Sequence, residues 1–451
     1  MNNIYTSPLS NRYGSDEMRL IFSDNNKYST WRYLWYVLAC AERRLGLDIT
    51  SEQTQEMFEH INDIDYNAVA KYERETKHDV MAHLKEFCSK CPTAEPIIHL
   101  GATSCYITDN TDILIMREAL QSIKMKLNRL LCTLADFARE YAGVPTMAYT
   151  HLQPAQPTTI GKRSCMWIQD LMMDMKSLND IDIKILGCNG ATGTQASFLT
   201  LFEDESKVFK LNEILADMLV GNKNNYLLIS GQTYTRKIDS MISDILSNIA
   251  QSTHKMCNDI RLLQGMHEIC EPFGDKQVGS SAMAYKRNPI KCENVCSLSR
   301  HIISLTMTTK MNACTQWLER SLDDSANRRL VIPELFILTD HILNQCIEIV
   351  NGLIINEDTI SKHITDNIPL VIMETVIMNA VKAGISSQKA HDRIRTLSSI
   401  ARDNSISLLT LIRTDEMLGN IGIKTSEYPD KSELIGMAEK QVERYLLEIK
   451  M

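Results

Sequence analysis

The sequence predicts an all-α protein built around a bundle of long helices. Glycine and proline, the residues that most often interrupt helices, number only 18 and 11 among 451 residues. Leucine, methionine, lysine and glutamate, which favour helices, are abundant instead. Apolar residues also recur at three- and four-residue steps over long segments, which is typical of helices that pack side by side.

The chain is expected to fold as three domains, because 451 residues exceed one compact core. Residues 1–103 are predicted to form a helical cap domain, with turn-forming residues and with aromatic residues crowded onto one helix. Residues 104–355 are predicted to form a central domain of long helices. The apolar pattern shortens after Ile355, so 356–451 are predicted to form a small helical domain.

The central domain is expected to contain at least four long helices. They are predicted over 111–141, 161–186, 233–266 and 326–350. A helix of about 30 residues spans on the order of 45 Å at 1.5 Å per residue. Such helices with apolar residues on several faces are expected to pack against copies of the chain, although a monomeric bundle with a thicker core is the alternative.

Composition and charge disfavour several classes of protein. Charged residues make up 23% of the chain and no unbroken apolar run approaches roughly 18 residues, so no membrane association is expected. The net charge of −8 disfavours nucleic acid as a partner. No targeting peptide is visible and the 13 cysteines suggest free thiols, so a cytoplasmic location is expected. Cys88 and Cys91 lack the second pair that a zinc site needs.

A polar loop at 279–293 carries the strongest chemical signal. It reads Gly279-Ser280-Ser281-Ala282-Met283-Ala284-Tyr285-Lys286-Arg287-Asn288-Pro289 and is followed by Glu293. A glycine-opened loop with two hydroxyl groups, successive backbone amides and a lysine, placed just before a helix, can bind an anion. A solvated connecting loop is the alternative interpretation.

This loop resembles the signature Gly-Ser-Ser-x-Met-Pro-x-Lys-x-Asn-Pro of the fumarase/aspartase/argininosuccinate lyase superfamily. Its Tyr-Lys-Arg-Asn-Pro sequence is most similar to that of the adenylosuccinate lyase branch. Further blocks match in the family's order along essentially the whole chain; they begin at Arg12, His78, His99, Thr150, Gly193, Gly231 and Trp317. Ala284 stands where the family usually has proline, which loosens the loop by about 0.4–1 kcal/mol.

The resemblance implies a fumarase/aspartase-like fold and a homotetramer with a multi-helix core, in which subunits share active sites. It implies a lyase of AMP and IMP biosynthesis that needs no cofactor or metal. The implied reaction is a β-elimination that releases fumarate from adenylosuccinate, leaving AMP, and from SAICAR, leaving AICAR. The alternatives are another superfamily lyase, such as argininosuccinate lyase or fumarase, or a catalytically silent structural member.

The same resemblance assigns roles to particular residues. His151 is the implied general acid and Ser280 the general base, with Lys286 and the loop amides supplying positive potential. His78 is the second candidate proton carrier, with mainly an orienting role. The implied substrate-contacting residues are Arg12, Tyr13, Lys77, Asp79, Thr103, Ser104, Thr150, Gln232, Asn288, Arg320, Ser325 and Arg329. Arginine suits the nucleotide phosphate because its planar fork can hold two oxygens.

Overall fold

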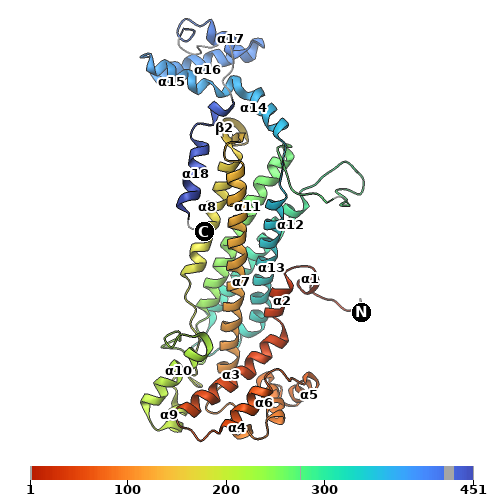
Figure 1. Cartoon of the computed structure of the whole chain (residues 1–451), viewed down its shortest axis with the longest axis vertical. Coiled ribbons are helices and arrows are strands. Elements are labelled where there is room, and N and C mark those ends of the chain that lie inside the picture. Colours follow the sequence, from red (N-terminus) through yellow and green to blue (C-terminus); the bar gives the residue numbers. More distant parts are fainter. Residues whose placement is uncertain (1–2, 275, 421–430, 450–451) are drawn as a thin grey trace. The chain divides into compact units, whose positions relative to one another are not determined.

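A computed structural model describes residues 3–274, 276–420 and 431–449. Helices dominate these residues, which confirms the all-α prediction (Figure 1). The contacts group the chain into two units. Unit 1 comprises Met1–Asn128, Met173–His254 and Asn294–Gln345, and unit 2 comprises Arg129–Met172, Lys255–Glu293 and Cys346–Met451. The three-domain division at 103 and 355 stays a prediction, although α7 begins at Ser104 and β4 ends at Ile355.

The N-terminal part of unit 1 is a set of short helices around one longer aromatic helix. The elements are α1 (Pro8–Asn11), α2 (Asp16–Ile21), α3 (Asp24–Arg44), α4 (Ser51–Glu59), α5 (Tyr66–Thr76), α6 (Asp79–Lys90) and a 3₁₀ helix, η1 (Glu95–Ile97). The side chain of Ser23 caps α3 by accepting a backbone N–H, as serine favours at this position. Trp31 and Trp35 of α3 are buried, and Arg32 forms a buried ion pair with Glu86.

Five long helices form the middle of the chain. They are α7 (Ser104–Glu140), α8 (Ile160–Asp180), α11 (Lys237–Gly265), α12 (Ile290–Thr315) and α13 (Asp324–Asn351), with α9 (Ala196–Phe202) and α10 (Glu205–Val220) between α8 and α11. Four of the five correspond to the predicted long helices. The prediction was wrong in extending α8 to residue 186, because Ile181, Ile183 and Ile185 alternate with polar residues as in a strand, and Ile185 bridges Tyr226.

Unit 2 contains the hairpin that the sequence did not predict. Strands β1 (Pro145–Thr150) and β2 (Gln153–Thr159) are antiparallel, and β3 (Ile269–Cys270) pairs with β4 (Ile354–Ile355). The remaining elements are α14 (Glu357–Val371), α15 (Met373–Lys382), α16 (Ser387–Asn404), α17 (Leu408–Arg413), the 3₁₀ helix η2 (Lys431–Ile435) and α18 (Ala438–Glu448). Helices of ordinary length therefore follow residue 356, with α16 packed on both α15 and α17.

Two helical segments in the described residues are long and apolar enough to cross a membrane, Asp324–Asn351 and Glu357–Lys382. The apolar windows of these segments are 67% and 39% buried within the protein. The first segment also carries Asp324, Arg328 and Asp340 in ion pairs with residues of unit 1. Core helices of soluble proteins meet the same criterion, so the two segments are weak evidence for a membrane span.

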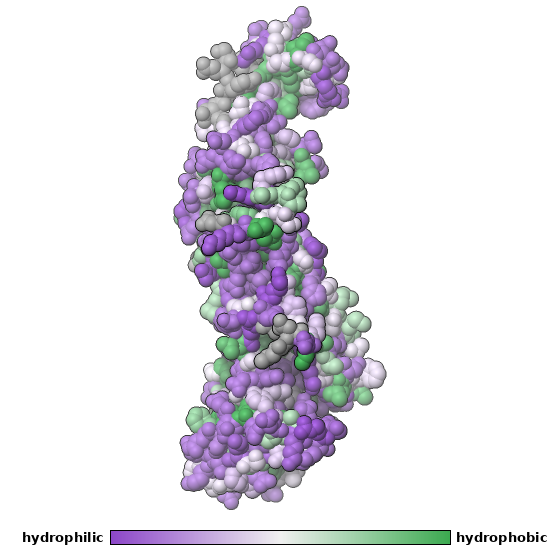
Figure 2. All heavy atoms as spheres, turned by 90° about the vertical axis from the view of Figure 1, so that its right-hand side faces the viewer, coloured by the Kyte–Doolittle hydropathy of each residue, from purple (hydrophilic) through white to green (hydrophobic). Residues whose placement is uncertain are grey.

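Large apolar side chains are exposed along the long helices. On the face shown in Figure 2, hydrophobic residues lie among hydrophilic ones at several separate places. Those exposed on the long helices include Met125, Met241, Met307, Met311 and Leu330 in unit 1 and Met166 and Leu262 in unit 2. Apolar side chains on outward faces of long helices are typical of surfaces that pack against another chain.

Candidate active site

The signature loop in unit 2 directs two backbone amides at Ser280. The Ser280 Oγ accepts the N–H of Ala282 at 3.3 Å and the N–H of Met283 at 3.1 Å. Asn288 Nδ2 closes the loop by donating to the Gly279 carbonyl at 2.7 Å. A side chain at Gly279 has no room, because a Cβ would lie 1.9 Å from the Lys286 carbonyl oxygen. Two amides aimed at one hydroxyl oxygen stabilise negative charge on it.

Buried polar groups fix the base of this loop. Gln264, near the end of α11, donates from Nε2 to the Arg287 carbonyl at 3.0 Å and accepts the Glu271 N–H at 3.0 Å. The buried Glu271 carboxylate accepts the N–H groups of Lys291 and Cys292, each at 2.9 Å, and so caps α12. The loop is therefore anchored at its C-terminal end.

His151 lies at the tip of the hairpin β1–β2. His151 and Leu152 form its two-residue turn, and their φ angles are +53° and +60°. A two-residue turn of type I′ requires positive φ at both positions, which asparagine and glycine adopt far more readily than leucine does. Thr150, His151 and Leu152 are all exposed. The turn thus presents the imidazole to solvent at the expense of backbone strain.

In unit 1, the structure brings the Lys77-His78-Asp79 segment to Arg329. Lys77 ends α5 in the left-handed conformation, and His78 caps α6 by accepting the Met81 N–H at its Nδ1, 3.4 Å away. Because Nδ1 accepts, a neutral His78 carries its proton on Nε2. Asp79 pairs with Arg329 at 3.1 Å, while 61% of the Arg329 side chain stays exposed.

The segment with Arg12 and Tyr13 is fastened to α13. The Tyr13 ring packs edge-on against His341, with centroids 5.0 Å apart. The N–H of Ser15 donates to Asp340 Oδ2 at 2.6 Å, and Lys126 of α7 pairs with the same buried carboxylate. Arg12 itself is exposed. A partly buried ion pair therefore fixes the end of a segment whose arginine faces solvent.

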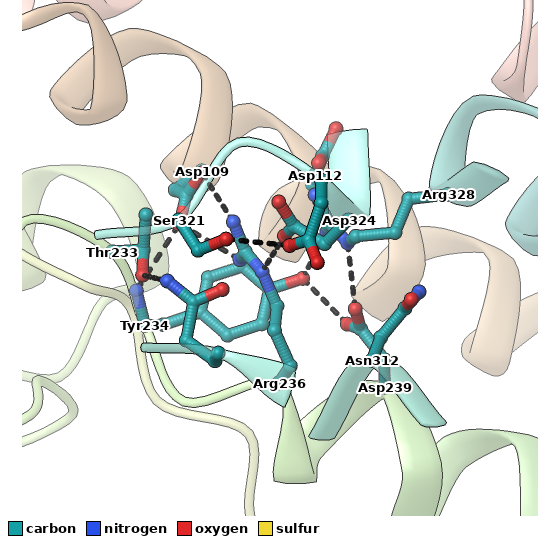
Figure 3. Close-up of polar contacts among 12 residues, drawn as sticks. Asp109, Asp112, Thr233, Tyr234, Arg236, Asp239, Asn312, Ser321, Asp324 and Arg328 are labelled. Carbon is teal, nitrogen blue, oxygen red and sulfur yellow. Dashed lines mark hydrogen bonds and ion pairs between the residues drawn. The ribbon is translucent and has the colours of Figure 1, made fainter. Parts of the chain in front are cut away.

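A buried ion-pair network in unit 1 was not predicted from the sequence (Figure 3). Arg236 donates from Nε to Asp324 at 2.5 Å and from Nη1 to Asp109 at 2.9 Å. Arg328 donates from Nε to Asp239 at 2.7 Å. It also pairs with Asp112 at 2.9 Å and contacts the Tyr234 hydroxyl, which donates to Asp239 at 2.5 Å. The paired residues Asp112 and Arg328 lie more than two hundred positions apart in the chain, so single charges in the sequence gave no hint of the network.

Several predicted substrate-contacting residues adjoin the network. Arg320 pairs with Asp324 at 3.1 Å, and Ser325 is the next residue of α13. Burial raises the pKa of Asp324, but the charges of the neighbouring arginines outweigh it and hold that pKa below its usual value. Gln232 joins the same region, since its N–H donates to the Glu319 carbonyl at 3.0 Å.

The start of α7 completes this group of residues. Thr103 precedes the helix and Ser104 is its first residue, and both are partly buried. Cys105 Sγ donates to Gln232 Oε1 at 3.5 Å, which links α7 to the loop that carries Gln232. A side chain at Gly231 would meet the Glu319 carbonyl oxygen at 2.6 Å, so the two loops approach closely.

Comparison with known proteins identifies the family. A family model described as a lyase matches residues 12–304. Adenylosuccinate lyase of Saccharomyces cerevisiae is 43% identical over 454 residues, which cover 98% of this chain and 94% of that protein. The chain belongs to the adenylosuccinate lyase family. Adenylosuccinate lyase of Schistosoma mansoni is 42% identical, with coverage of 98% and 94%. As a member of this family, the chain is a carbon–nitrogen lyase.

Solved structures share the fold of the adenylosuccinate lyase family. The 3-carboxy-cis,cis-muconate lactonizing enzyme from Pseudomonas putida has a TM-score of 0.83 at 24% identity, and 97% of each chain is covered. A fumarate lyase from Mesorhizobium sp. BNC1 has a TM-score of 0.83 at 20% identity, covering 99% of this chain and all of that one. The predicted fumarase/aspartase-like fold is confirmed. The roles of the individual site residues stay predictions.

Proposed function

We propose that the chain is an adenylosuccinate lyase, which releases fumarate from adenylosuccinate to leave AMP and from SAICAR to leave AICAR. The full-length similarity to adenylosuccinate lyases supports the choice of a succinyl-purine nucleotide as substrate. The observation that carries the chemistry is the pair of amides at the Ser280 hydroxyl. The proposal also includes a role in purine biosynthesis and a cytoplasmic location.

Ser280 acts as the general base of the elimination. Its Oγ takes a proton from the succinyl carbon next to a carboxylate, while the bond from the neighbouring carbon to nitrogen breaks. A serine alkoxide is too basic to persist unaided at pH 7, but the amides of Ala282 and Met283 and the exposed Lys286 stabilise its charge. Asn288, Thr103, Ser104 and Gln232 are the proposed donors to the doubly charged carboxylate that forms.

His151 donates the proton that the departing nitrogen takes up when the carbon–nitrogen bond breaks. A histidine imidazole can hold a proton and give it to the departing amine. His78 orients substrate from Nε2, because its Nδ1 already accepts the Met81 N–H. These two proton movements balance the reaction, so the mechanism needs no cofactor or metal ion.

The nucleotide phosphate is held by arginines. Arg12, Arg320 and Arg329 are the proposed clamp, with Tyr13, Lys77, Asp79, Thr150 and Ser325 as further substrate contacts. The Arg329 side chain stays 61% exposed while one of its nitrogens pairs with Asp79, which orients the guanidinium. An arginine oriented in advance loses less entropy when it binds phosphate.

A homotetramer with shared active sites is proposed as the working assembly. The exposed apolar side chains of the long helices, such as Met307 and Met311, support it, because they need a covering surface. The proposed subunit keeps the three-domain division at 103 and 355. Nucleic acid is not a proposed partner, given the net charge of −8, and neither is a membrane.

The test follows turnover of four substrates by the purified protein. Adenylosuccinate is expected to lose its succinyl-purine absorbance and SAICAR its succinyl-aminoimidazole absorbance, and both are expected to yield fumarate. Ser280→Ala and His151→Ala are each expected to lower kcat by about a hundredfold to ten-thousandfold. Ser51→Ala, at an exposed serine on α4, is the matched control and should keep the wild-type rate. Turnover of argininosuccinate or malate in place of the succinyl-purines would overturn the proposal.

A further inference from the structure

A buried carboxylate lies beneath the hairpin that carries His151, and the mechanism above does not use it. Glu268 is fully buried in unit 2. It accepts the Tyr149 hydroxyl at 2.5 Å, the Nδ1–H of His363 at 2.7 Å and the Thr146 hydroxyl at 3.4 Å. A buried carboxylate is costly unless donors satisfy it, and two of these three donors lie on β1.

A buried arginine holds the same strand. Arg163 of α8 donates from Nη2 to the Met147 carbonyl at 2.9 Å and from Nη1 to the Thr146 hydroxyl at 3.5 Å. Burial lowers the pKa of Arg163, and the charge of Glu268 opposes that effect. Burial and the hydrogen bond to Glu268 raise the pKa of Tyr149, so its phenol stays a donor. The negative charge of Glu268 and the positive charge of Arg163 therefore both hold β1, through contacts between Thr146 and Tyr149.

The backbone around Glu268 is itself fixed. Its N–H donates to the Leu263 carbonyl at 3.0 Å, and its carbonyl accepts the Asn356 N–H at 2.9 Å. Asn356 caps α14, the helix that carries His363. Helix α14 packs on both β1 and β2, and Gln156 Nε2 of β2 donates to the Val371 carbonyl at its end. Glu268 thus ties the hairpin to α11 and α14 at one point.

The turn at His151 needs such support. A two-stranded hairpin is marginally stable by itself. A turn whose two residues, His151 and Leu152, have positive φ persists only where its surroundings hold it. Tyr149 lies two residues before His151 and is the last residue of β1 with a described side-chain anchor.

We infer that Glu268, acting through the Tyr149 hydroxyl, is a positioning residue for His151. The inference rests on the proposed role of His151 as the general acid. Glu268 does not touch the substrate. Its effect is to keep the imidazole where the departing nitrogen receives the proton, and a displacement of about 1 Å at such a point costs up to a hundredfold in rate.

The experiment compares Glu268→Gln and Tyr149→Phe with the wild type, using adenylosuccinate. Glu268→Gln is expected to lower kcat about tenfold to a hundredfold, and Tyr149→Phe about tenfold, with KM within about twofold. Tyr149→Phe removes a single hydroxyl, so it tests the inference even if Glu268→Gln folds poorly. Tyr445→Phe on α18 is the matched control, because its hydroxyl makes no hydrogen bond within the described residues, and it should match the wild type.

A double-mutant cycle separates positioning from a general structural effect. If Glu268 acts through His151, Tyr149→Phe should lower the residual rate of His151→Ala by less than twofold. An equal loss with or without His151, or an unchanged kcat in both single variants, would overturn the inference. Failure of the proposed function is distinguishable, since the wild type itself would then not turn over adenylosuccinate.

Discussion

The predicted phosphate-contacting residues of unit 1 and the predicted proton carriers of unit 2 are held by different kinds of interaction. Arg320 and Ser325 adjoin a buried network in which Arg236 and Arg328 pair with aspartates. Ser280, by contrast, is held by amides of its own exposed loop, and His151 stands on a strained two-residue turn. Charge pairing dominates the first region, whereas backbone geometry shapes the loop and the turn of the second.

This difference separates stability from activity. A buried ion-pair network is rigid, and removing one partner leaves an uncompensated charge in the interior. An exposed loop has few buried contacts, so it opens at little cost and can close on a substrate. Substitutions in the network should therefore lower the free energy of unfolding, whereas substitutions in the loop or the turn should lower the catalytic rate.

The largest expected effect is that of Arg236→Met. The change leaves Asp109 and Asp324 buried without this partner, and we expect the free energy of unfolding to fall by about 3–5 kcal/mol. Urea denaturation measures it. Arg139→Met, which breaks the exposed pair with Asp136, is the control and should cost less than about 1 kcal/mol. Equal losses in the two variants would contradict a stabilising role for the network.

Glu42→Gln tests the opposite situation in unit 1, a buried acid with no hydrogen-bond partner among the described residues. Burial raises the pKa of Glu42 to about 9 from its usual 4.5. Between these two pH values, Glu42 holds a proton in the folded protein that it has lost in the unfolded chain. The free energy of unfolding of the wild type should therefore fall with rising pH, by up to about 1.4 kcal/mol per unit.

Glutamine stays neutral, so Glu42→Gln should stabilise the protein by a few kcal/mol at pH 8 and by nearly nothing at pH 4. Urea denaturation at the two pH values gives the comparison. A destabilised variant at pH 8 would show that Glu42 is ionised and paired in the folded protein. Glu42 would then belong to the buried charge pairs of unit 1.

Asp340→Asn tests the anchor of the Arg12-Tyr13 segment. The change weakens the bond from Ser15 and removes the ion pair with Lys126, while Lys126 keeps Glu17 at 3.0 Å. The loosened segment should raise KM for adenylosuccinate roughly tenfold, which corresponds to about 1.4 kcal/mol, with kcat unchanged. Glu17→Gln, at the exposed partner of Lys126, serves as the control. A lower kcat with an unchanged KM would refute the binding role.

The smallest expected effect is that of Ala284→Pro in the signature loop. The Lys286 N–H donates to the Met283 carbonyl at 3.0 Å, so Ala284 occupies the second position of a β-turn, which proline favours. The loop should be stabilised by about 0.4–1 kcal/mol. Trypsin cleavage after the exposed Lys286 or Arg287 should then slow about twofold to fivefold. Faster cleavage would show that this turn is incompatible with proline.

The sequence predicted the parts of the fold that depend on local periodicity. Apolar spacing located α7, α8, α11 and α13, and the signature sequence located Ser280. It did not reveal the hairpin, because His151 and Leu152 are not residues that favour a two-residue turn. It also missed Glu268 and Arg236, since each acts through partners more than eighty positions away.

The central claim is that Ser280 performs chemistry while other residues bind the nucleotide, and a calorimetric titration of Ser280→Ala with adenylosuccinate tests it most directly. The account predicts binding within about threefold of the value that KM suggests for the wild type, with turnover lowered at least about a hundredfold. AMP and fumarate should be scarce in the titrated sample. Wild-type release of fumarate by Ser280→Ala, or loss of binding, would contradict the assignment.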